Sequence, residues 1–311
     1  MNRIWLSVVL PISFFVVPVQ PAEATFDLMQ IEQVIGGVNC DTTAQAIQLR
    51  MRANFQNLVS QARLRVWDAQ GLNPVVVINF GQNVAFAGCG RRVLITSLNF
   101  NSLTNPNTIP DFTMTNLIPS SYLAAGSLTF ESDGGIIYWR LSWGGGSYTG
   151  PTTGDFTNDG DGDFGPPWPG PLPAGGVAAL QFQGACSALS TTNAADYALT
   201  SSAAVFINNA AQSFALPEPS AADLTGPSGM PDGCVDAFDL GAMLGAWCSG
   251  VNDPNPPSPP CENCTPANLA IADISGAANL PDGCVDAFDL AKLLAEWCSV
   301  AGGNPCGTCG P

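Results

Sequence analysis

A ten-residue segment occurs twice in this chain, and it constrains the C-terminal third more than any other feature. Residues 231–240 and 281–290 are identical at all ten positions, with an offset of 50 residues. Around this segment the similarity continues without a gap, so that residues 222–249 align with residues 272–299. One supersecondary unit therefore occurs twice.

Each copy predicts an acidic loop followed by a short helix. Beyond the loop, apolar residues recur at i, i+3, i+4 and i+7, which is the pattern of one apolar helix face. They are Leu240, Met243, Leu244 and Trp247 in the first copy, and Leu290, Leu293, Leu294 and Trp297 in the second. Since neither helix can bury such a face alone, we expect the two helices to pack against each other.

The loops carry carboxylates at spacings that suit a hard cation. An EF-hand-type loop ligates calcium from positions 1, 3, 5, 7, 9 and 12, and it has glycine at position 6. With Asp232 at position 5, Gly233 falls at position 6, and the same register recurs in the second copy. The predicted ligands are Asp223, Asp232, the Cys234 carbonyl, Asp236 and Asp239, and in the second copy Asp273, Asp282, the Cys284 carbonyl, Asp286 and Asp289. We therefore expect one calcium ion per repeat.

With aspartate at position 12 and a single helix after each loop, residues 222–299 resemble a pair of dockerin repeats. They are most similar to the cysteine-containing, GC-type dockerin-like tails of secreted bacterial proteins. The resemblance implies a tail that binds a cohesin-like receptor in a larger assembly or at the cell surface. Dockerins commonly select their partner with loop positions 10 and 11, which here are Ala237 and Phe238 in the first copy and Ala287 and Phe288 in the second. Alternatively, both phenylalanines belong to the core of the tail.

The spacing departs from the usual loop at one point. Asp223 and Asp232 are nine residues apart, whereas positions 1 and 5 of an EF-hand-type loop are four apart. A helix cap is the alternative that needs no ion: Asp236 as N-cap, with Asp239 three residues later, resembles a capping box. Capping alone requires neither Asp232 nor Gly233, which favours calcium.

Residues 25–216 predict a mainly β domain. Apolar and polar residues alternate in many short segments that are separated by glycine-rich turns, and no long helix is indicated. The expected strands are 27–34, 47–51, 63–67, 75–80, 93–97, 127–131, 136–143, 177–183 and 204–208. This pattern favours an antiparallel β-sandwich. Residues 47–80 faintly resemble lamin-tail-type immunoglobulin-like (Ig-like) domains, which implies an Ig-like sandwich. Residues 217–221 form a proline-containing linker to the small α-helical tail, residues 222–311, with its two loop–helix repeats.

Two features of the β domain point to ligands. One is a glycine-rich acidic loop that offers a second calcium site, with Asn158, Asp159, Asp161 and Asp163 as candidate ligands. A solvated loop is the alternative. The other is a group of aromatic residues that would suit sugar stacking: Tyr138, Trp139, Trp143, Tyr148 and Trp168. We favour a place in the core for these rings.

The N-terminal segment has the pattern of an export signal. Arg3 precedes an apolar run over residues 4–19, and residues 22–24 form an A-x-A cleavage site. We expect residues 1–24 to be a signal peptide and the mature protein to be secreted or held at the cell surface. The net charge of −16 repels phosphate, so nucleic acid is not an expected partner.

Catalysis finds little support. The chain has no histidine, which excludes a Ser-His-Asp triad and histidine-ligated zinc. Glycoside hydrolysis needs two carboxylates across a cleft. Glu32 and Glu131 are the only glutamates between residues 25 and 216, and nothing in the sequence pairs them. We therefore expect a non-catalytic protein whose calcium-binding tail tethers the β-sandwich to a cohesin-like partner or a cell-surface scaffold. The alternatives are an extracellular carbohydrate-binding module and a polysaccharide hydrolase, each carrying the same tail.

The eleven cysteines predict disulfide bonds in an exported protein. Eight lie after residue 230, where they would compensate for a small core, and Cys40, Cys89 and Cys186 lie before it. The odd total leaves at least one thiol unpaired or intermolecular. Two schemes for the tail stay open. Antiparallel helices would allow the pairs Cys234–Cys298 and Cys248–Cys284; otherwise each repeat pairs with a trailing C-x-x-C, at Cys261 and Cys264 or at Cys306 and Cys309.

Overall fold

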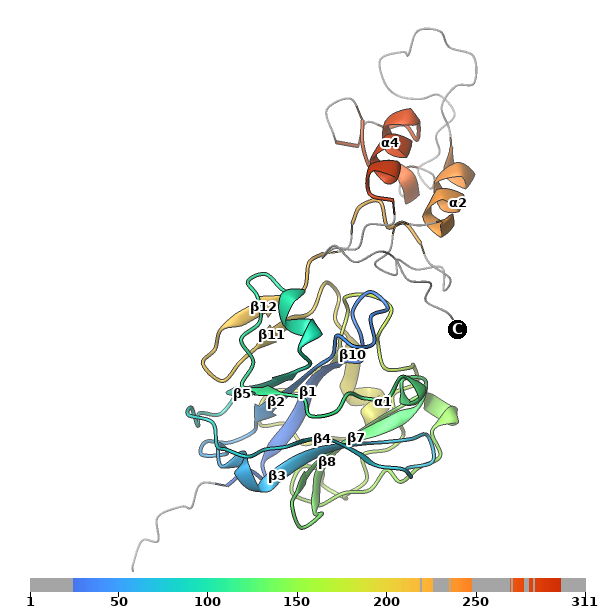
Figure 1. Ribbon diagram of the computed structural model, residues 1–311. Coiled ribbons are helices and arrows are strands. Elements are labelled where there is room, and N and C mark those ends of the chain that lie inside the picture. Colours follow the sequence, from blue (N-terminus) through green and yellow to red (C-terminus); the bar gives the residue numbers. More distant parts are fainter. Residues whose placement is uncertain are drawn as a thin grey trace, which may run out of the picture.

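The computed structural model describes residues 25–218, 220–225, 235, 237–247, 269, 271–276, 280–281 and 283–297. These residues form a mainly β domain, followed by a small unit in which two helices lie side by side (Figure 1). The expected signal peptide, residues 1–24, lies outside them. No helix in these ranges is long and apolar enough to cross a membrane.

The β domain contains twelve strands. They are β1 Met29–Ile35, β2 Ala46–Met51, β3 Ala62–Trp67, β4 Val75–Asn79, β5 Arg92–Thr96, β6 Phe112–Thr113, β7 Gly126–Ser132, β8 Ile137–Trp143, β9 Leu180–Phe182, β10 Tyr197–Leu199, β11 Val205–Ile207 and β12 Ser213–Ala215. The nine expected strands are confirmed. The three that were not expected, β6, β10 and β12, are only two or three residues long, too short to show alternation.

Few helices accompany these strands. The α-helices are α1 Asn193–Asp196, α2 Ala237–Ala246 and α4 Ala287–Ala295, and the short 3-10 helices are Val59–Gln61, Asn99–Ser102, Ser120–Tyr122 and Gly145–Ser147. The absence of a long helix agrees with the sequence pattern in the described ranges.

The strands form two main sheets and one hairpin. One sheet has the order β10-β9-β1-β2-β5-β6, the other has the order β4-β3-β7-β8, and β11 pairs with β12. Neighbouring strands are antiparallel except for β5 and β6, which run parallel. Buried residues from both sheets, among them Ile31, Leu49, Leu128 and Leu141, belong to one core. This two-layer packing is consistent with the expected β-sandwich.

The burial of each strand follows from what covers its two faces. In β3 the apolar residues Ala62, Leu64 and Val66 are buried and alternate with half-buried polar or aromatic ones, as expected for a sheet with one covered face. All seven residues of β1 are buried instead. On the other face of this sheet, Ile35 belongs to a second core with Phe206 of β11 and Phe214 of β12. Glu32, also in β1, is buried there in contacts with Gln48, Arg50 and Arg92.

The tail core is small. It consists of the buried residues Ala222, Val235, Met243, Ala246, Ala272, Val285 and Leu293. Helices α2 and α4 contact each other, as expected. However, the expected apolar face is wrong in part, because Leu244 and Leu294 are 55% and 53% exposed and Trp297 is 37% exposed. Residues before each helix, Val235 and Val285, fill the core in their place.

Candidate functional site

The acids at the end of the two predicted loops are fully buried, and each binds backbone amides. Asp289 Oδ1 accepts hydrogen bonds from Ile274 N at 2.7 Å and Ser275 N at 2.8 Å, and its Oδ2 accepts one from Asp286 N at 2.8 Å. Each acid therefore fastens the segment at the start of its repeat to the first turn of its helix.

The first repeat uses Asp239 in the same way. Its Oδ1 accepts hydrogen bonds from Leu224 N at 2.6 Å and from Thr225 N at 2.8 Å. These amides are offset by 50 residues from those that Asp289 binds. The sequence duplication is thus a duplication of this hydrogen-bonded closure, which spans 14 or 15 residues of chain in each copy.

The helix-cap interpretation is confirmed in the second repeat. Asp286 is the N-cap of α4, its Oδ1 accepts a hydrogen bond from Phe288 N at 2.8 Å, and Asp286 and Asp289 form a capping box. Two of the amides that would otherwise lack partners at the start of a helix are satisfied without an ion. The equivalent N-cap of the first repeat, Asp236, lies outside the described residues.

Asp273, the first predicted ligand of the second loop, contacts Gly283 in spite of the long spacing between them. Asp273 Oδ2 accepts a hydrogen bond from Gly283 N at 2.9 Å, ten residues along the chain. Gly283 has φ +86°, a conformation that residues with a Cβ rarely adopt. The residues predicted at positions 1 and 6 are therefore in contact in this repeat.

The carboxylates of Asp273 and Asp289 are close enough for their charges to interact. Burial raises the pKa of Asp289, and the negative charge of Asp273 raises it further, against the three amide donors that lower it. A divalent cation between these acids would relieve their repulsion, so the charge of the site fits calcium. The capacity of Asp289 to ligate an ion is limited, because an ionised carboxylate has about four lone-pair sites and Asp289 already accepts three hydrogen bonds.

Most of the remaining predicted ligands are not among the described residues. Asp232, Cys234, Asp236 and Asp282 fall outside the described residues, whereas Asp223 is described and 5% exposed. Within the described ranges, no group of three or more Asp, Glu, Cys or His side chains is placed to hold a metal ion. Cys284 is disulfide-bonded, as is Cys40, and both partners lie outside the described residues, so the two disulfide schemes stay open.

The residues predicted to select a partner are at the surface. Phe238 and Phe288 are each 50% exposed, and Ala237 and Ala287 beside them are exposed too. The alternative in which both phenylalanines are buried in the tail core is therefore wrong. Leu244 and Leu294, six residues and about 1.7 turns further along each helix, are exposed in both copies as well.

The acidic loop of the β domain is closed by its own backbone. Asp159 Oδ1 accepts hydrogen bonds from Asp161 N at 2.9 Å and Gly162 N at 3.1 Å, and Asp161 Oδ1 accepts one from Asp163 N at 2.9 Å. Asp159 Oδ2 is buried without a hydrogen-bond partner. Burial raises the pKa of Asp159, and the adjacent Asp161 carboxylate contributes to this shift.

Asn158 does not take part in that acidic group as a ligand. Its side-chain amide donates to the backbone oxygens of Asp27 at 2.8 Å and Tyr138 at 2.7 Å, and its Oδ1 accepts a 2.7 Å hydrogen bond from Arg52. The residue is fully buried. Its role is to join three segments of the β domain.

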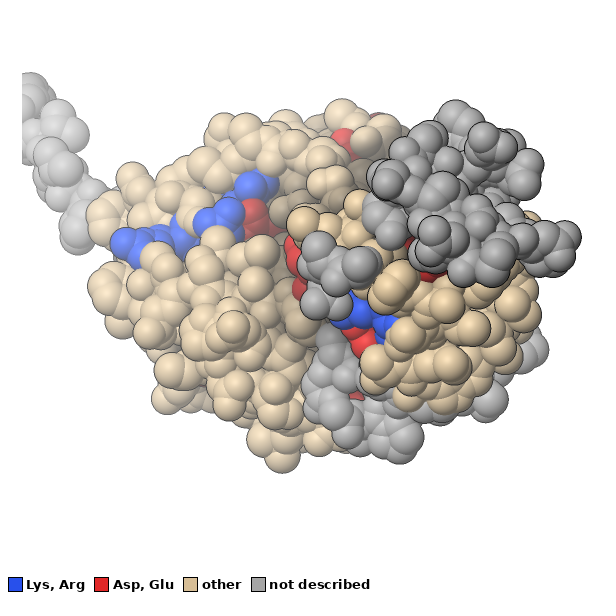
Figure 2. Space-filling view, turned by 90° about the horizontal axis from the view of Figure 1, so that it is seen from above, with Lys and Arg blue, Asp and Glu red and all other residues tan. Residues whose placement is uncertain are grey.

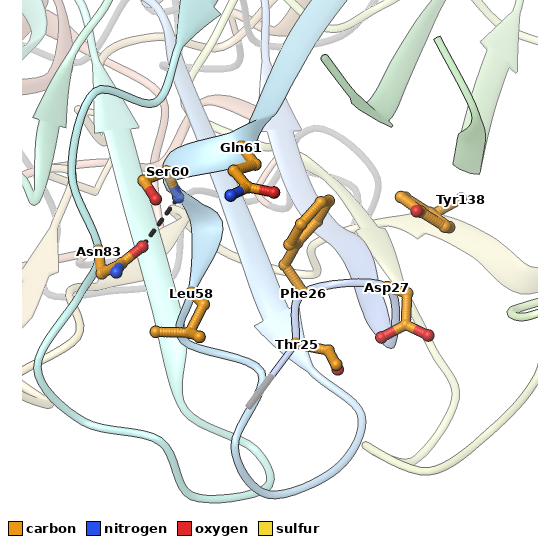
Figure 3. A pocket seen from close by; sticks show the side chains of 8 residues that line it. All are labelled: Thr25, Phe26, Asp27, Leu58, Ser60, Gln61, Asn83 and Tyr138. Atoms are coloured by element: carbon orange, nitrogen blue, oxygen red, sulfur yellow. Dashed lines mark hydrogen bonds between the residues drawn. The ribbon is translucent and has the colours of Figure 1, made fainter. Parts of the chain in front are cut away.

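The aromatic residues considered for sugar stacking are mostly in the core. Trp139 and Trp143 are fully buried and Tyr148 is 6% exposed, which confirms the core interpretation for these three. Tyr138 lies at the edge of a cavity of about 500 Å³ whose lining also includes Phe26, Asp27, Ser60 and Asn83. Figure 3 shows the Phe26 and Tyr138 rings on one side of this cavity and Ser60 and Asn83 on the other.

The two glutamates of the β domain are held in ion pairs. Glu32 pairs with Arg50 at 2.9 Å and with Arg92 at 2.8 Å, and Glu131 pairs with Arg63 at 3.1 Å and with Arg65. On the face that Figure 2 presents, the basic side chains lie next to acidic ones, while some acidic side chains lie apart from any basic one. Glu32 in β1 and Glu131 in β7 belong to different sheets, and each is buried among its own arginine partners.

Comparison with known proteins gives no further guide to the site. The chain matches no protein-family model and no curated protein sequence.

Proposed function

We propose that this is a secreted, non-catalytic protein in which a dockerin-like tail attaches an Ig-like β-sandwich to a cohesin-like partner or a cell-surface assembly. In this proposal each repeat binds one calcium ion, and the face that carries Phe238 or Phe288 meets the partner. The proposal explains why a small unit with two nearly equivalent helices follows a much larger β domain.

The observation that carries the proposal is the matched exposure of large apolar side chains on the two helices. Phe238 and Phe288 are both 50% exposed, and Leu244 and Leu294 are 55% and 53% exposed. Complete burial of a Phe or Leu side chain stabilises a protein by about 1.5–3 kcal/mol, so half of that remains to be gained on docking. A partner that covers one such pair would gain about 1.5–3 kcal/mol before the costs of association.

The acids of the second loop support the calcium part of the proposal. Asp273 and Asp289 are close enough for their charges to interact, and Asp273 is held at the glycine of the loop. If calcium is bound, Asp273 and the remaining lone pair of Asp289 would be ligands, together with residues outside the described ranges. Calcium would then neutralise the charge that raises the pKa of Asp289.

The experiment is a retention assay with the mature chain on a surface, the envelope fraction of the producing cell as the sample, and calcium or a chelator in the buffer. We compare F238S, F288S and the double variant with F156S, a control that alters a phenylalanine of the β domain that is 69% exposed. Because either helix can present the same face, each single variant should keep partner binding and the double variant should lose it. The proposal fails if the double variant retains the same proteins as the control.

A polysaccharide ligand is the alternative that the cavity beside Tyr138 supports, because its lining combines aromatic rings with polar side chains. Co-sedimentation of the mature chain with insoluble polysaccharides tests it, with Y138A as the variant. Trp143 is unsuitable for this purpose, since it is fully buried. Sedimentation that Y138A abolishes would favour the carbohydrate-binding module over the tether.

A further inference from the structure

Two cysteines of the β domain that are far apart in the sequence meet at the surface. Cys89 lies between β4 and β5, and Cys186 lies between β9 and α1, 97 residues later. Their sulfur atoms are 2.7 Å apart, and both are free thiols. We propose that Cys89 and Cys186 form a disulfide bond, which fastens these two connections to each other in an oxidising compartment.

The backbone on the Cys89 side is held in place for this contact. Cys89 N donates a 2.8 Å hydrogen bond to Asn54 Oδ1, and Gly90 N donates one of 2.8 Å to Met51 O. Gly90 has φ +79°, which lets the chain turn sharply next to the cysteine. Cys89 Sγ also lies 3.3 Å from Arg52 O.

The Cys186 side is fastened to the same segment. The Arg52 guanidinium donates hydrogen bonds to Ser187 O at 3.0 Å and to Ala188 O at 2.9 Å. Both connections are therefore anchored to residues 51–54, at the end of β2. The two sulfurs need to approach by only about 0.7 Å to reach the disulfide bond length of about 2.05 Å.

The two thiols share a hydrogen bond in which either sulfur can be the donor. This bond is the main cause that raises the pKa of Cys89, followed by burial, whereas the positive charges of Arg50 and Arg52 act in the opposite direction. Once a thiolate forms, it is next to its bonding partner.

The reaction needs an external oxidant, and we assign that role to a disulfide such as oxidised glutathione or the active-site disulfide of an oxidoreductase. A thiolate attacks the oxidant and forms a mixed disulfide, and the second sulfur then displaces the leaving thiol. Two S–H bonds are lost and one S–S bond forms. Two electrons pass to the oxidant, which is reduced to two thiols, and the two protons go to those thiols.

This pairing also locates the odd cysteine. Removing Cys89 and Cys186 from the eleven leaves nine, which are Cys40 and the eight cysteines after residue 230. The unpaired or intermolecular thiol is thus expected in that group and not in the Cys89–Cys186 pair.

Peptide mapping tests the proposal directly. Cleavage before aspartate releases residues 68–110, in which Cys89 is the only cysteine, and residues 163–195, in which Cys186 is the only one. The mature chain is incubated with oxidised glutathione, alkylated and digested without reduction. We expect one linked peptide whose mass is the sum of the two minus two hydrogens, and which separates on reduction. Recovery of both peptides alkylated, or linked to another cysteine, overturns the proposal.

Stability measurements give a second readout on intact protein. C89S and C186S should each lower the melting temperature of the β domain in the oxidised protein by the same amount, and the double variant should lower it no further, because the same single bond is lost in all three. Variants whose β domain melts at the temperature of the oxidised wild type would contradict the bond. Neither readout involves a binding partner, so failure of the tether proposal leaves this result unaffected.

Discussion

Replacement of Asp289 by alanine should separate the two roles that its carboxylate can play. The side chain is fully buried and accepts hydrogen bonds from Ile274 N, Ser275 N and Asp286 N. D289A removes both acceptor oxygens and with them all three hydrogen bonds. D289N keeps one oxygen that can still serve Ile274 and Ser275, but it places an amide donor against the Asp286 amide.

The magnitudes follow from the number of donors left without an acceptor. Each buried donor that loses its partner costs about 1–3 kcal/mol. D289A should therefore destabilise the tail by about 3–6 kcal/mol, allowing for partial compensation by water, and D289N by about 1–3 kcal/mol. Since a whole domain is stable by only about 5–15 kcal/mol, the alanine variant is expected to leave the tail largely unfolded.

Hydrogen–deuterium exchange of the α2 and α4 amides in the mature chain measures this loss locally. Protection should fall by about 100-fold to 10,000-fold in D289A, and by less in D289N. D133A is the control, because it removes one exposed negative charge from the β domain. If only capping matters, these losses are the same with calcium and with a chelator. If calcium is also bound, the wild type gains protection on adding calcium and D289N loses that gain.

The reasoning would be refuted by a particular pattern of exchange. In chelator, protection of α4 in D289A within tenfold of the wild type would mean that the three hydrogen bonds do not stabilise the loop. Equal effects of D289A and D289N would mean that the shared acceptor for Ile274 and Ser275 is unimportant.

Two further predictions concern the β domain. Because burial raises the pKa of Asp159, the folded state binds its proton more tightly than the unfolded state does. That stabilising contribution is present below the unfolded pKa of about 3.9 and is lost as the pH rises through the raised pKa. Calcium bound at the acidic loop would offset this loss of stability. Thermal unfolding from about pH 3 to about pH 7 measures both effects, and D159N should abolish both. The second prediction concerns Glu131. The variant E131Q leaves Arg63 and Arg65 without a counter-charge and should lower the free energy of unfolding by about 3–5 kcal/mol, as measured by urea unfolding. A loss below about 1 kcal/mol would show that these ion pairs contribute no more than solvent-exposed ones.

The sequence predicted strand positions well where one face of a strand is covered. β3 shows the clear alternation of buried and half-buried residues that its sequence pattern indicates. β1 is buried on both faces, and this could not be predicted, because the contacts on its second face are tertiary. Ile35 packs with Phe206 and Phe214, which come from a hairpin more than 170 residues later, and Glu32 pairs with Arg50 and Arg92. The helix faces were predicted less well, since short helices in a small core bury only part of an apolar stripe.

The candidate site was predicted in its residues but not in its contacts. The spacing suggested a capping box of Asp236 and Asp239 in the first repeat, and the structure shows this box for the equivalent residues of the second repeat, Asp286 and Asp289. The hydrogen bonds from Ile274 N and Ser275 N depend on how the loop closes, and no local sequence pattern predicts this closure. The Cys89–Cys186 contact is also a tertiary feature, because it arises where two distant connections are both anchored near Arg52.

The two repeats differ where they face the rest of the chain, and this bears on how a partner would be presented. Glu296, at the end of α4, forms an ion pair with Lys292 and accepts a hydrogen bond from the Ser220 hydroxyl in the connector. Its counterpart at the end of α2 is Ala246, which is 4% exposed in the tail core and has no carboxylate to make that contact. The exposed apolar residues are thus duplicated, whereas the Glu296 contact with the connector has no equivalent at Ala246. The first repeat instead adjoins the connector directly, and Asp223 N donates a 3.0 Å hydrogen bond to Ser220 O. A partner seated on either helix would therefore hold the β domain through a repeat that is bonded to the connector.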